Sequence, residues 1–203
     1  TIIDYGYGNI YSLVSVLKYI GLDPLVSKDP EKIKYGDIIF LPGVGAFKSA
    51  MQQLLKFNMD DAIKFALNRG SFLIGICLGY QMLFEESEEF GTFKGLGLLR
   101  GKVVNLKNYR NKNFRIPNVG WHPLKKYSTN SHRLSFFEGD LVYFVHSYIP
   151  VSYDKKIISS CIEYGNDLLH TSVESDQIMG FQFHPEKSGE VGIKILDKLI
   201  RRL

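Results

Sequence analysis

The chain has 203 residues, 45% of them hydrophobic and 23% charged, and a formal net charge of +4. This is ordinary globular composition, and no apolar run approaches the roughly 20 residues of a membrane span. Lys and Arg form no block, and the first residues have no basic region followed by a long apolar stretch. We therefore expect no nucleic-acid binding, no membrane segment and no signal peptide.

The two cysteines, Cys77 and Cys161, form neither a Cys-x-x-Cys pair nor a metal-ligand cluster. Free thiols are typical of a cytoplasmic protein, and neither a metal nor an organic cofactor is predicted. For any single cysteine the default is a small, buried, hydrophobic side chain. There is no repeat, low-complexity linker or convincing boundary, so residues 1–203 are predicted to form one domain.

Strands and helices are predicted to alternate three times in the first part of the chain. Short apolar runs indicate the strands, and apolar residues at helical spacing indicate the helices. The strands are predicted at residues 2–5, 37–41 and 72–76, and the helices at 10–20, 49–67 and 79–84. Such alternation is typical of an α/β layer fold with a mainly parallel sheet.

The second half of the chain has a different pattern. Residues 102–178 consist of short strands and turns, with the clearest strands at 141–148 and 157–162. This pattern predicts an antiparallel section joined to the parallel sheet. A helix over 189–203 ends the chain, with Val191, Ile195, Leu196 and Leu199 on its apolar stripe.

The segment Gly75-Ile76-Cys77-Leu78-Gly79 lies between an apolar strand and a predicted helix. It is similar to the Gly-x-Ser-x-Gly nucleophile elbow, in which a sharp turn exposes the nucleophile. A helix N-terminus lowers the pKa of a thiol, and the thiolate is the reactive form. The N–H of Leu78 would then point at an oxyanion. The motif by itself leaves open a packed core cysteine followed by a glycine-rich turn.

The loop Pro42-Gly43-Val44-Gly45 follows the preceding strand. If the two strands are parallel neighbours, both loops leave the sheet at the same edge, where open α/β sheets place their sites. The glycines would let the backbone approach a ligand or flip a peptide plane. A plain tight turn is the alternative.

A cysteine nucleophile needs a base and a group that orients the base. His184-Pro185-Glu186 follows an alternating strand that is predicted to end at His184, and Glu186 could fold back to its Nδ1 atom. A structural role for His184 is the alternative. His146 is a rival base, but it lies mid-strand without a nearby carboxylate, so we interpret it as structural or pocket-lining.

Several segments together resemble class I (triad-type) glutamine amidotransferases. They are residues 42–47, 75–81 and 181–188. Within this class the chain is most similar to the glutaminase subunit of imidazole glycerol phosphate synthase, which residues 4–9, 120–121 and 143–148 also match. The resemblance covers the whole chain. It implies a flavodoxin-like α/β fold, with helices on both faces of a central, mainly parallel sheet and an antiparallel section in the second half.

The resemblance implies Cys77 as nucleophile, His184 as base and acid, and Glu186 as the orienting group. It also implies an oxyanion hole near Val44 and Leu78, with a loop that a bound partner can rearrange. The implied glutamine-binding residues are Gly43, Gly45, Gln81, Glu89, Ser147 and Tyr148. Without the resemblance, the acidic run at 85–89 would indicate a solvated helix end.

The resemblance also implies a partner, a (β/α)8-barrel cyclase subunit. The cyclase receives ammonia through a protected channel and makes imidazole glycerol phosphate and an aminoimidazole carboxamide nucleotide. The residues that match its interface are Tyr7, Asn9, Trp121, Tyr143 and Lys187. An exposed Trp121 would be a natural anchor for a partner, and core packing is the alternative.

The chain departs from the family at the expected interface. Where the family often has His-x-Gly-Trp-Asn, this chain has Asn118 and His122 around the shared Gly-Trp. One alternative is therefore a paralogous amidotransferase subunit that feeds another synthase, such as a surface-sugar amidination enzyme. Two others are a cysteine peptidase of similar fold, which would cleave peptides without a partner, and a binding protein with an inactive glutaminase fold.

Overall fold

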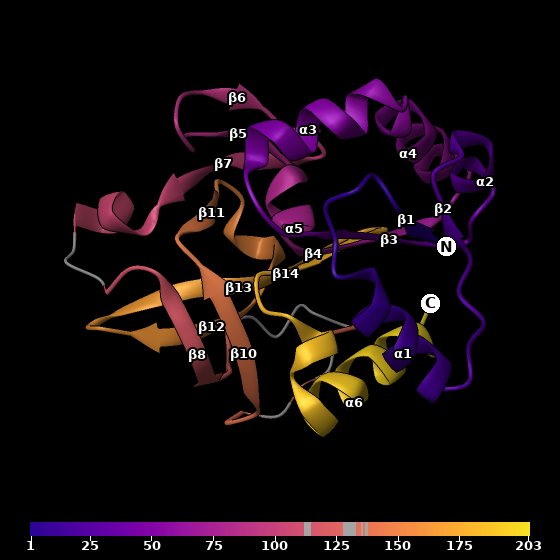
Figure 1. Ribbon diagram of the computed structural model, residues 1–203. Helices are drawn as coiled ribbons and strands as arrows, with labels where there is room; N and C mark the ends of the chain where they lie inside the picture. The colour runs from indigo at the N-terminus through magenta and orange to yellow at the C-terminus, as the bar shows by residue number, and fades with distance from the viewer. Residues whose placement is uncertain (112–114, 128–132, 135, 137) are drawn as a thin grey trace.

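The computed structural model describes residues 1–111, 115–127, 133–134, 136 and 138–203. Within this part of the chain, a mixed sheet of eight strands forms the centre of the molecule (Figure 1). In spatial order they are β2 (Val26–Ser27), β1 (Ile2–Ile3), β3 (Ile38–Gly43), β4 (Phe72–Cys77), β14 (Ile178–Phe181), β13 (Asp167–Ser175), β12 (Ile158–Tyr164) and β9 (Lys125–Lys126). Neighbours from β2 to β14 are parallel, and those from β14 to β9 are antiparallel. The predicted α/β fold with an antiparallel section is confirmed.

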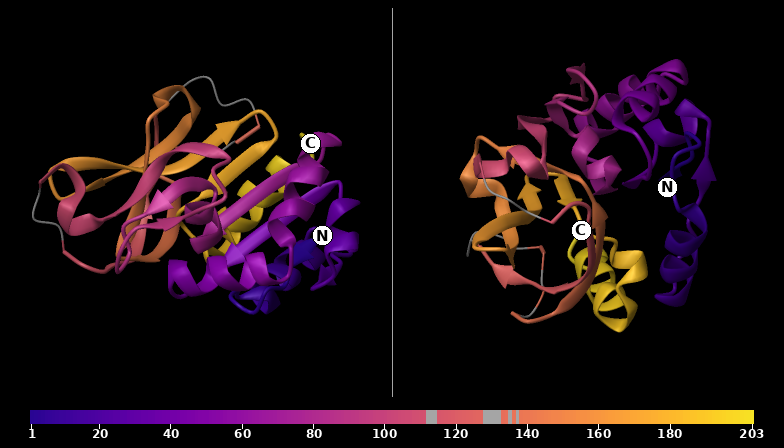
Figure 2. Two further views of the ribbon diagram at one scale, coloured as in Figure 1. Left: turned by 90° about the horizontal axis from the view of Figure 1, so that it is seen from above. Right: turned by 60° about the vertical axis from the view of Figure 1, so that its left-hand side comes forward.

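Two smaller sheets lie beside the antiparallel part. One pairs β8 (Asn118–Pro123) with β10 (Leu141–His146), and the other has the order β11 (Tyr148–Ser152), β7 (Leu99–Asn105), β5 (Phe84–Ser87) and β6 (Phe93–Lys94). Figure 2 shows that the second half of the chain gathers most of its strands at the end of the molecule away from both termini.

Helices cover both faces of the parallel part of the sheet, as expected (Figure 1). On one face lie α1 (Ile10–Tyr19) and α6 (Gly189–Ile200), and on the other lie α2 (Pro30–Lys34), α3 (Phe47–Lys56), α4 (Met59–Asn68) and α5 (Leu78–Met82). In β4, Ile74 packs with the first group and Leu73 with the second. A strand buried on both faces must be apolar throughout, which explains the unbroken apolar run at 72–76.

The single helix predicted over 49–67 is wrong, because these residues form two helices, α3 and α4. Asn58 separates them with a left-handed backbone, φ 53°. Asn adopts this conformation more readily than most residues. Apolar residues continue at helical spacing on both sides of the break, so periodicity alone could not reveal it.

Other boundaries also differ from the prediction. The strand expected over 141–148 is two strands, since β10 ends at His146 and β11 begins at Tyr148. The acidic run at 85–89 overlaps strand β5 and does not end a helix. Two short elements, β2 and α2, are missing from the prediction. Helix α2 nevertheless has a readable start signal, because the Asp29 side chain accepts a hydrogen bond from the Glu31 N–H and a proline follows it.

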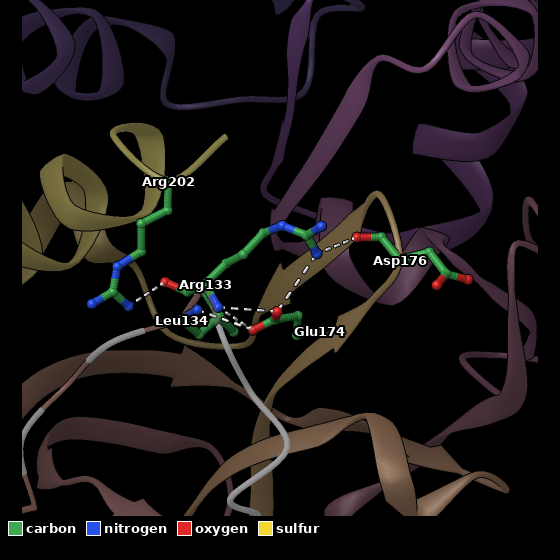
Figure 3. A network of polar contacts seen from close by, with 5 residues as sticks. All are labelled: Arg133, Leu134, Glu174, Asp176 and Arg202. Carbon is green, nitrogen blue, oxygen red and sulfur yellow. Dashed lines mark hydrogen bonds and ion pairs between the residues drawn. The ribbon is translucent and has the colours of Figure 1, made fainter.

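A polar network holds Arg133 and Leu134 against β13 and the end of α6 (Figure 3). The backbone N–H groups of Arg133 and Leu134 donate to the Glu174 carboxylate at 3.0–3.1 Å. The Arg133 guanidinium donates to the Asp176 carbonyl at 2.7 Å, and Arg202 donates to the Arg133 carbonyl at 3.2 Å. The network therefore joins the C-terminal end of the chain to the antiparallel part of the sheet.

Candidate active site

Cys77 lies at the turn from strand β4 to helix α5, with a left-handed backbone of φ 53°. Such strain in a non-glycine residue is typical of a nucleophile elbow. Its flanking glycines allow the turn. A Cβ at Gly79 would overlap the carbonyl oxygen of Leu41, and one at Gly75 would lie 2.8 Å from the Tyr80 Cα. The predicted elbow geometry is confirmed.

We expect Gly79→Ala to lose most of its stability, because the new methyl group would meet fixed backbone. Gly97→Ala is the matched control, since a Cβ there meets nothing within 4 Å and only the left-handed backbone at φ 64° opposes it. The control should lose about 1–2 kcal/mol, and Gly79→Ala clearly more. Urea unfolding of both variants measures the difference. Equal losses would contradict the role of Gly79.

His184 and Glu186 form the expected pair. The Nδ1 atom of His184 lies 2.7 Å from Oε1 of Glu186, and both side chains are almost fully buried. Burial lowers the pKa of His184, but the interactions with Cys77 and Glu186 outweigh it and raise the pKa to about 10. Because Nδ1 faces Glu186, Nε2 is the nitrogen left for proton exchange with Cys77, and it has no hydrogen-bond partner among the described residues. The three residues can act as nucleophile, proton carrier and orienting carboxylate.

His184 does not end a strand as predicted. Strand β14 ends at Phe181, and His184 precedes a short 3-10 turn, η3 (Pro185–Lys187). Strand β10 holds it instead, because the His184 N–H donates to the Tyr143 carbonyl at 2.9 Å. The Ser188 hydroxyl donates to the His184 carbonyl at 2.6 Å and accepts from the Tyr143 N–H at 3.0 Å. A neighbouring sheet therefore positions this imidazole.

A cavity of about 370 Å³ opens beside Cys77. Its lining includes nearly all the residues that the sequence assigned to the site, together with some that it did not. They are Val44, Gly45, Cys77, Leu78, Gln81, Glu89, Phe90, Pro117, Val145, His146, Ser147, Tyr148 and His184. Gly43 lies just behind the wall, paired with Cys77 across β3 and β4. The pairing also confirms that the two glycine-rich loops leave the sheet at one edge.

The interpretation of His146 as a pocket-lining residue is confirmed. It is buried, and burial lowers its pKa to about 4, although a hydrogen bond to the Tyr148 carbonyl opposes this. Gln182 is a residue that the prediction missed. It is fully buried, and its amide N–H donates to the Cys77 Sγ at 3.8 Å. Its position between Phe181 and Phe183 in the sequence marks a polar residue among apolar ones, but does not show which residue it contacts.

Glu89 connects the cavity to the oxyanion loop. Its Oε2 accepts a hydrogen bond of 2.6 Å from the N–H of Phe47, at the start of helix α3. Burial raises the pKa of Glu89, and the Phe47 hydrogen bond opposes the rise. The carboxylate therefore lines the cavity and is held next to the start of α3.

One predicted oxyanion donor is engaged elsewhere. The Val44 N–H donates to the Tyr7 carbonyl at 3.0 Å. The Leu78 N–H, in contrast, lies at the first residue of α5, directly after Cys77. Gly45 has φ +99°, so the loop already uses a conformation that favours glycine. An oxyanion hole with both donors requires the Val44 peptide to leave Tyr7.

The predicted interface residues lie on the surface near this site. Trp121 is 51% exposed, so its alternative role in core packing is wrong. It pairs with Tyr143 across β8 and β10, with ring centroids 5.8 Å apart. Lys187 is exposed beside the triad, while Tyr7 and Asn9 lie in the turn before α1.

Neither a metal site nor a membrane helix is found in the described ranges. No group of three or more His, Cys, Asp or Glu residues there is arranged to hold a metal ion. None of the helices in the same ranges is long and apolar enough to cross a membrane.

The family model and the relatives found by comparison with known proteins point to the same family. The model of the glutamine amidotransferase class-I family matches residues 1–202. The imidazole glycerol phosphate synthase subunit HisH of Geobacillus thermodenitrificans is 42% identical over 201 residues, which cover 98% of this chain and 93% of that protein. The subunit of the same name from Aquifex aeolicus is 41% identical over 204 residues, covering 99% and 95%.

Solved structures agree at the level of the fold. A chain in the structure of PurLQS from Thermotoga maritima has a TM-score of 0.72 at 20% identity, covering 99% of this chain and 96% of that chain. A crystal structure of a glutamine amidotransferase has a TM-score of 0.71 at 17% identity, covering 99% and 95%. The elbow, the buried histidine–glutamate pair and these matches lead to one conclusion: the chain belongs to the class I glutamine amidotransferases and, within them, to the HisH subunits of imidazole glycerol phosphate synthase.

Proposed function

We propose that the chain hydrolyses glutamine to glutamate and ammonia and passes the ammonia to a (β/α)8-barrel cyclase subunit. That subunit uses the ammonia to form imidazole glycerol phosphate and an aminoimidazole carboxamide nucleotide. The observation that carries the glutaminase step is that Cys77 and His184 line one cavity, with Glu186 bonded to Nδ1 of His184. Membership of the HisH family supports the choice of partner over another synthase.

The proposed reaction begins with attack of the Cys77 thiolate on the side-chain amide carbon of glutamine. The N–H groups of Leu78 and, after rearrangement, Val44 stabilise the oxyanion, each by about 3 kcal/mol. His184 gives its proton to the leaving ammonia, which leaves a thioester on Cys77. Water that His184 deprotonates then attacks the thioester, and glutamate leaves.

The cavity offers groups for each end of glutamine. The Glu89 carboxylate suits the α-ammonium group, because a half-buried carboxylate is stabilised by a paired cation. Gln81, Ser147 and Tyr148 also line the cavity and are assigned to the rest of the substrate. The engaged Val44 N–H supports a resting state of low activity, which partner binding converts by freeing the loop.

The proposed docking surface is the outer face of strands β8 and β10. It consists of exposed apolar side chains, namely Val119, Trp121, Leu141 and Val145. Such a patch is typical of an interface, and aromatic residues usually contribute most of its binding energy.

Trp121→Ala should weaken binding of the cyclase by about 30-fold or more, since a central aromatic anchor contributes about 2 kcal/mol or more. Tyr35→Ala is the control, because Tyr35 is 62% exposed but lies on the far side, after helix α2. Surface plasmon resonance with immobilised cyclase gives both dissociation constants. Equal affinities for the two variants would exclude this face as the interface.

The partner itself is tested by reconstitution. Addition of a histidine-pathway cyclase and its nucleotide substrate should raise glutamine hydrolysis by the chain, measured as glutamate released. No stimulation, together with recovery of an ATP-dependent sugar amidotransferase in a pull-down, would favour a paralogous subunit that feeds another synthase.

We propose a cytoplasmic location, where free thiols such as Cys77 and Cys161 persist.

A further inference from the structure

A continuous run of hydrogen bonds leads from strand β8 toward the nucleophile. Nε2 of His122 lies 2.8 Å from Oδ1 of Asn118, and Nδ2 of Asn118 lies 3.0 Å from Nε2 of His146. Nδ1 of His146 lies 2.9 Å from the carbonyl oxygen of Tyr148. His122 is partly exposed next to Trp121, whereas Asn118 and His146 are buried. The run therefore starts at the surface and leads inward.

The same carbonyl group is also bonded from the side of the nucleophile. Nε2 of Gln81 donates to the Tyr148 carbonyl at 2.9 Å and to Oε1 of Gln182 at 3.1 Å. Gln182 in turn donates to the Sγ of Cys77 at 3.8 Å. The Tyr148 carbonyl is thus the junction between the surface histidine and the active-site cysteine.

The donor and acceptor roles follow from this junction. A carbonyl oxygen only accepts, so His146 must carry its proton on Nδ1. Burial keeps the pKa of His146 low, at about 4, so the ring is neutral at pH 7 and its Nε2 accepts. Asn118 must then turn its N–H to His146 and its oxygen to His122, which makes Nε2 of His122 a donor. One arrangement satisfies every group, and a satisfied buried network holds a single geometry.

The inner end of this run forms the wall of the cavity. His146, Tyr148 and Gln81 all line it. Both amide N–H groups of Gln81 are engaged, so Gln81 meets a ligand with its carbonyl oxygen. Its orientation depends on the Tyr148 carbonyl, which His146 fixes in turn.

We propose that His122 is a positioning residue for the glutamine pocket, acting through Asn118 and His146 on the wall formed by Tyr148 and Gln81. The inference rests on the proposed glutaminase function. Without the His122 donor, the buried Oδ1 atom of Asn118 loses its partner, and the Asn118 amide is held only by its bond to Nε2 of His146. The position of His146, and with it the wall, is then less restricted.

The test compares two replacements of His122 in the isolated chain, where no partner affects the result. His122→Phe removes the donor and keeps an aromatic ring against Phe144 and Tyr164, whose ring centroids lie 5.7 and 5.4 Å from that of His122. His122→Gln keeps an N–H donor near the position of Nε2. Both are made in a Cys77→Ser background, so that glutamine binds without being hydrolysed. Calorimetry gives the dissociation constant for glutamine.

We expect His122→Phe to raise the dissociation constant about 5- to 10-fold, the effect of one lost buried hydrogen bond. His122→Gln should stay within about 2-fold of the background chain. Nitrogen NMR of the His146 ring gives a second readout. The Nδ1–H tautomer should be seen in all three chains, because the Tyr148 carbonyl accepts from it, and the His146 ring signals should shift or broaden only in His122→Phe.

An unchanged dissociation constant in His122→Phe would overturn the inference. So would an equal rise in both variants together with lower melting temperatures, since that pattern indicates a packing role. A background chain that binds no glutamine but shows the Nδ1–H tautomer would contradict the proposed function instead. That result is visible before any His122 variant is compared.

Discussion

Replacement of Cys77 by Ala lowers the kcat of glutamine hydrolysis, measured with the cyclase present, by at least about 10⁴-fold. The physical reason is that the proposed thioester forms on the Cys77 thiolate, and no other described nucleophile lies at the elbow between β4 and α5. Release of glutamate from glutamine, followed over time, gives the rate. Binding of glutamine should persist, because the remaining walls of the cavity are intact.

Cys161→Ala is the matched control for this experiment. Cys161 is also a buried free thiol, but it lies in strand β12 and does not line the cavity. Its replacement should leave kcat within about 2-fold of wild type and cost only stability. A Cys77→Ala chain that retained glutaminase activity would refute the mechanism, and an inactive Cys161→Ala chain would show that the two thiols had been assigned wrongly.

Glu186→Gln gives the second large effect. The carboxylate orients His184 and stabilises its charged form, so we expect kcat to fall by about 10³- to 10⁴-fold. Loss of the negative charge also lowers the pKa of His184 from its raised value of about 10. The alkaline limb of kcat/KM should therefore move to lower pH by more than about one unit. A pH–rate profile of the complex measures both effects.

The raised pKa of His184 also predicts how the stability of the folded chain depends on pH. The pKa of His184 is raised to about 10 in the folded chain, above the ordinary value of 6.5. The resulting stabilisation is fully present below pH 6.5 and is lost as the pH rises toward 10. Wild type should therefore lose more stability than Glu186→Gln over this range. Glu190→Gln, an exposed carboxylate on α6, is the control and should change neither profile. An unmoved alkaline limb in Glu186→Gln would contradict the assigned role.

Local sequence signals predicted the parts of the fold that depend on apolar periodicity and glycine. The run at 72–76 had to be a strand buried on both faces, and the glycines around Cys77 indicated the elbow that the structure contains. The predicted boundaries were wrong where a single residue or a contact distant in the sequence decides where a helix or strand ends. Asn58 breaks a helix whose apolar spacing continues past it, and the chain between β10 and β11 changes sheets at one residue.

In the candidate site too, contacts between residues close in sequence were predictable and contacts between distant segments were not. His184 and Glu186 are two residues apart, so their contact was predictable. The engagement of the Val44 N–H by Tyr7 was not, because it joins loops after β1 and β3 that only the sheet brings together. Gln182 was missed for a related reason, since its polar side chain gains meaning only once Cys77 is its neighbour.

The sequence by itself determined the α/β layer, because it follows from short-range chemistry: turn glycines and apolar runs. It also indicated Cys77 and His184 as the candidate nucleophile and base, through the resemblance of several motifs together to one family. Only the tertiary structure decided which donors are free and which are engaged. It connected His122 in β8 to Gln81 in α5 through hydrogen bonds between segments far apart in the chain. Such bonds depend on exact distances between packed sheets, and a linear pattern of residue types does not contain those distances.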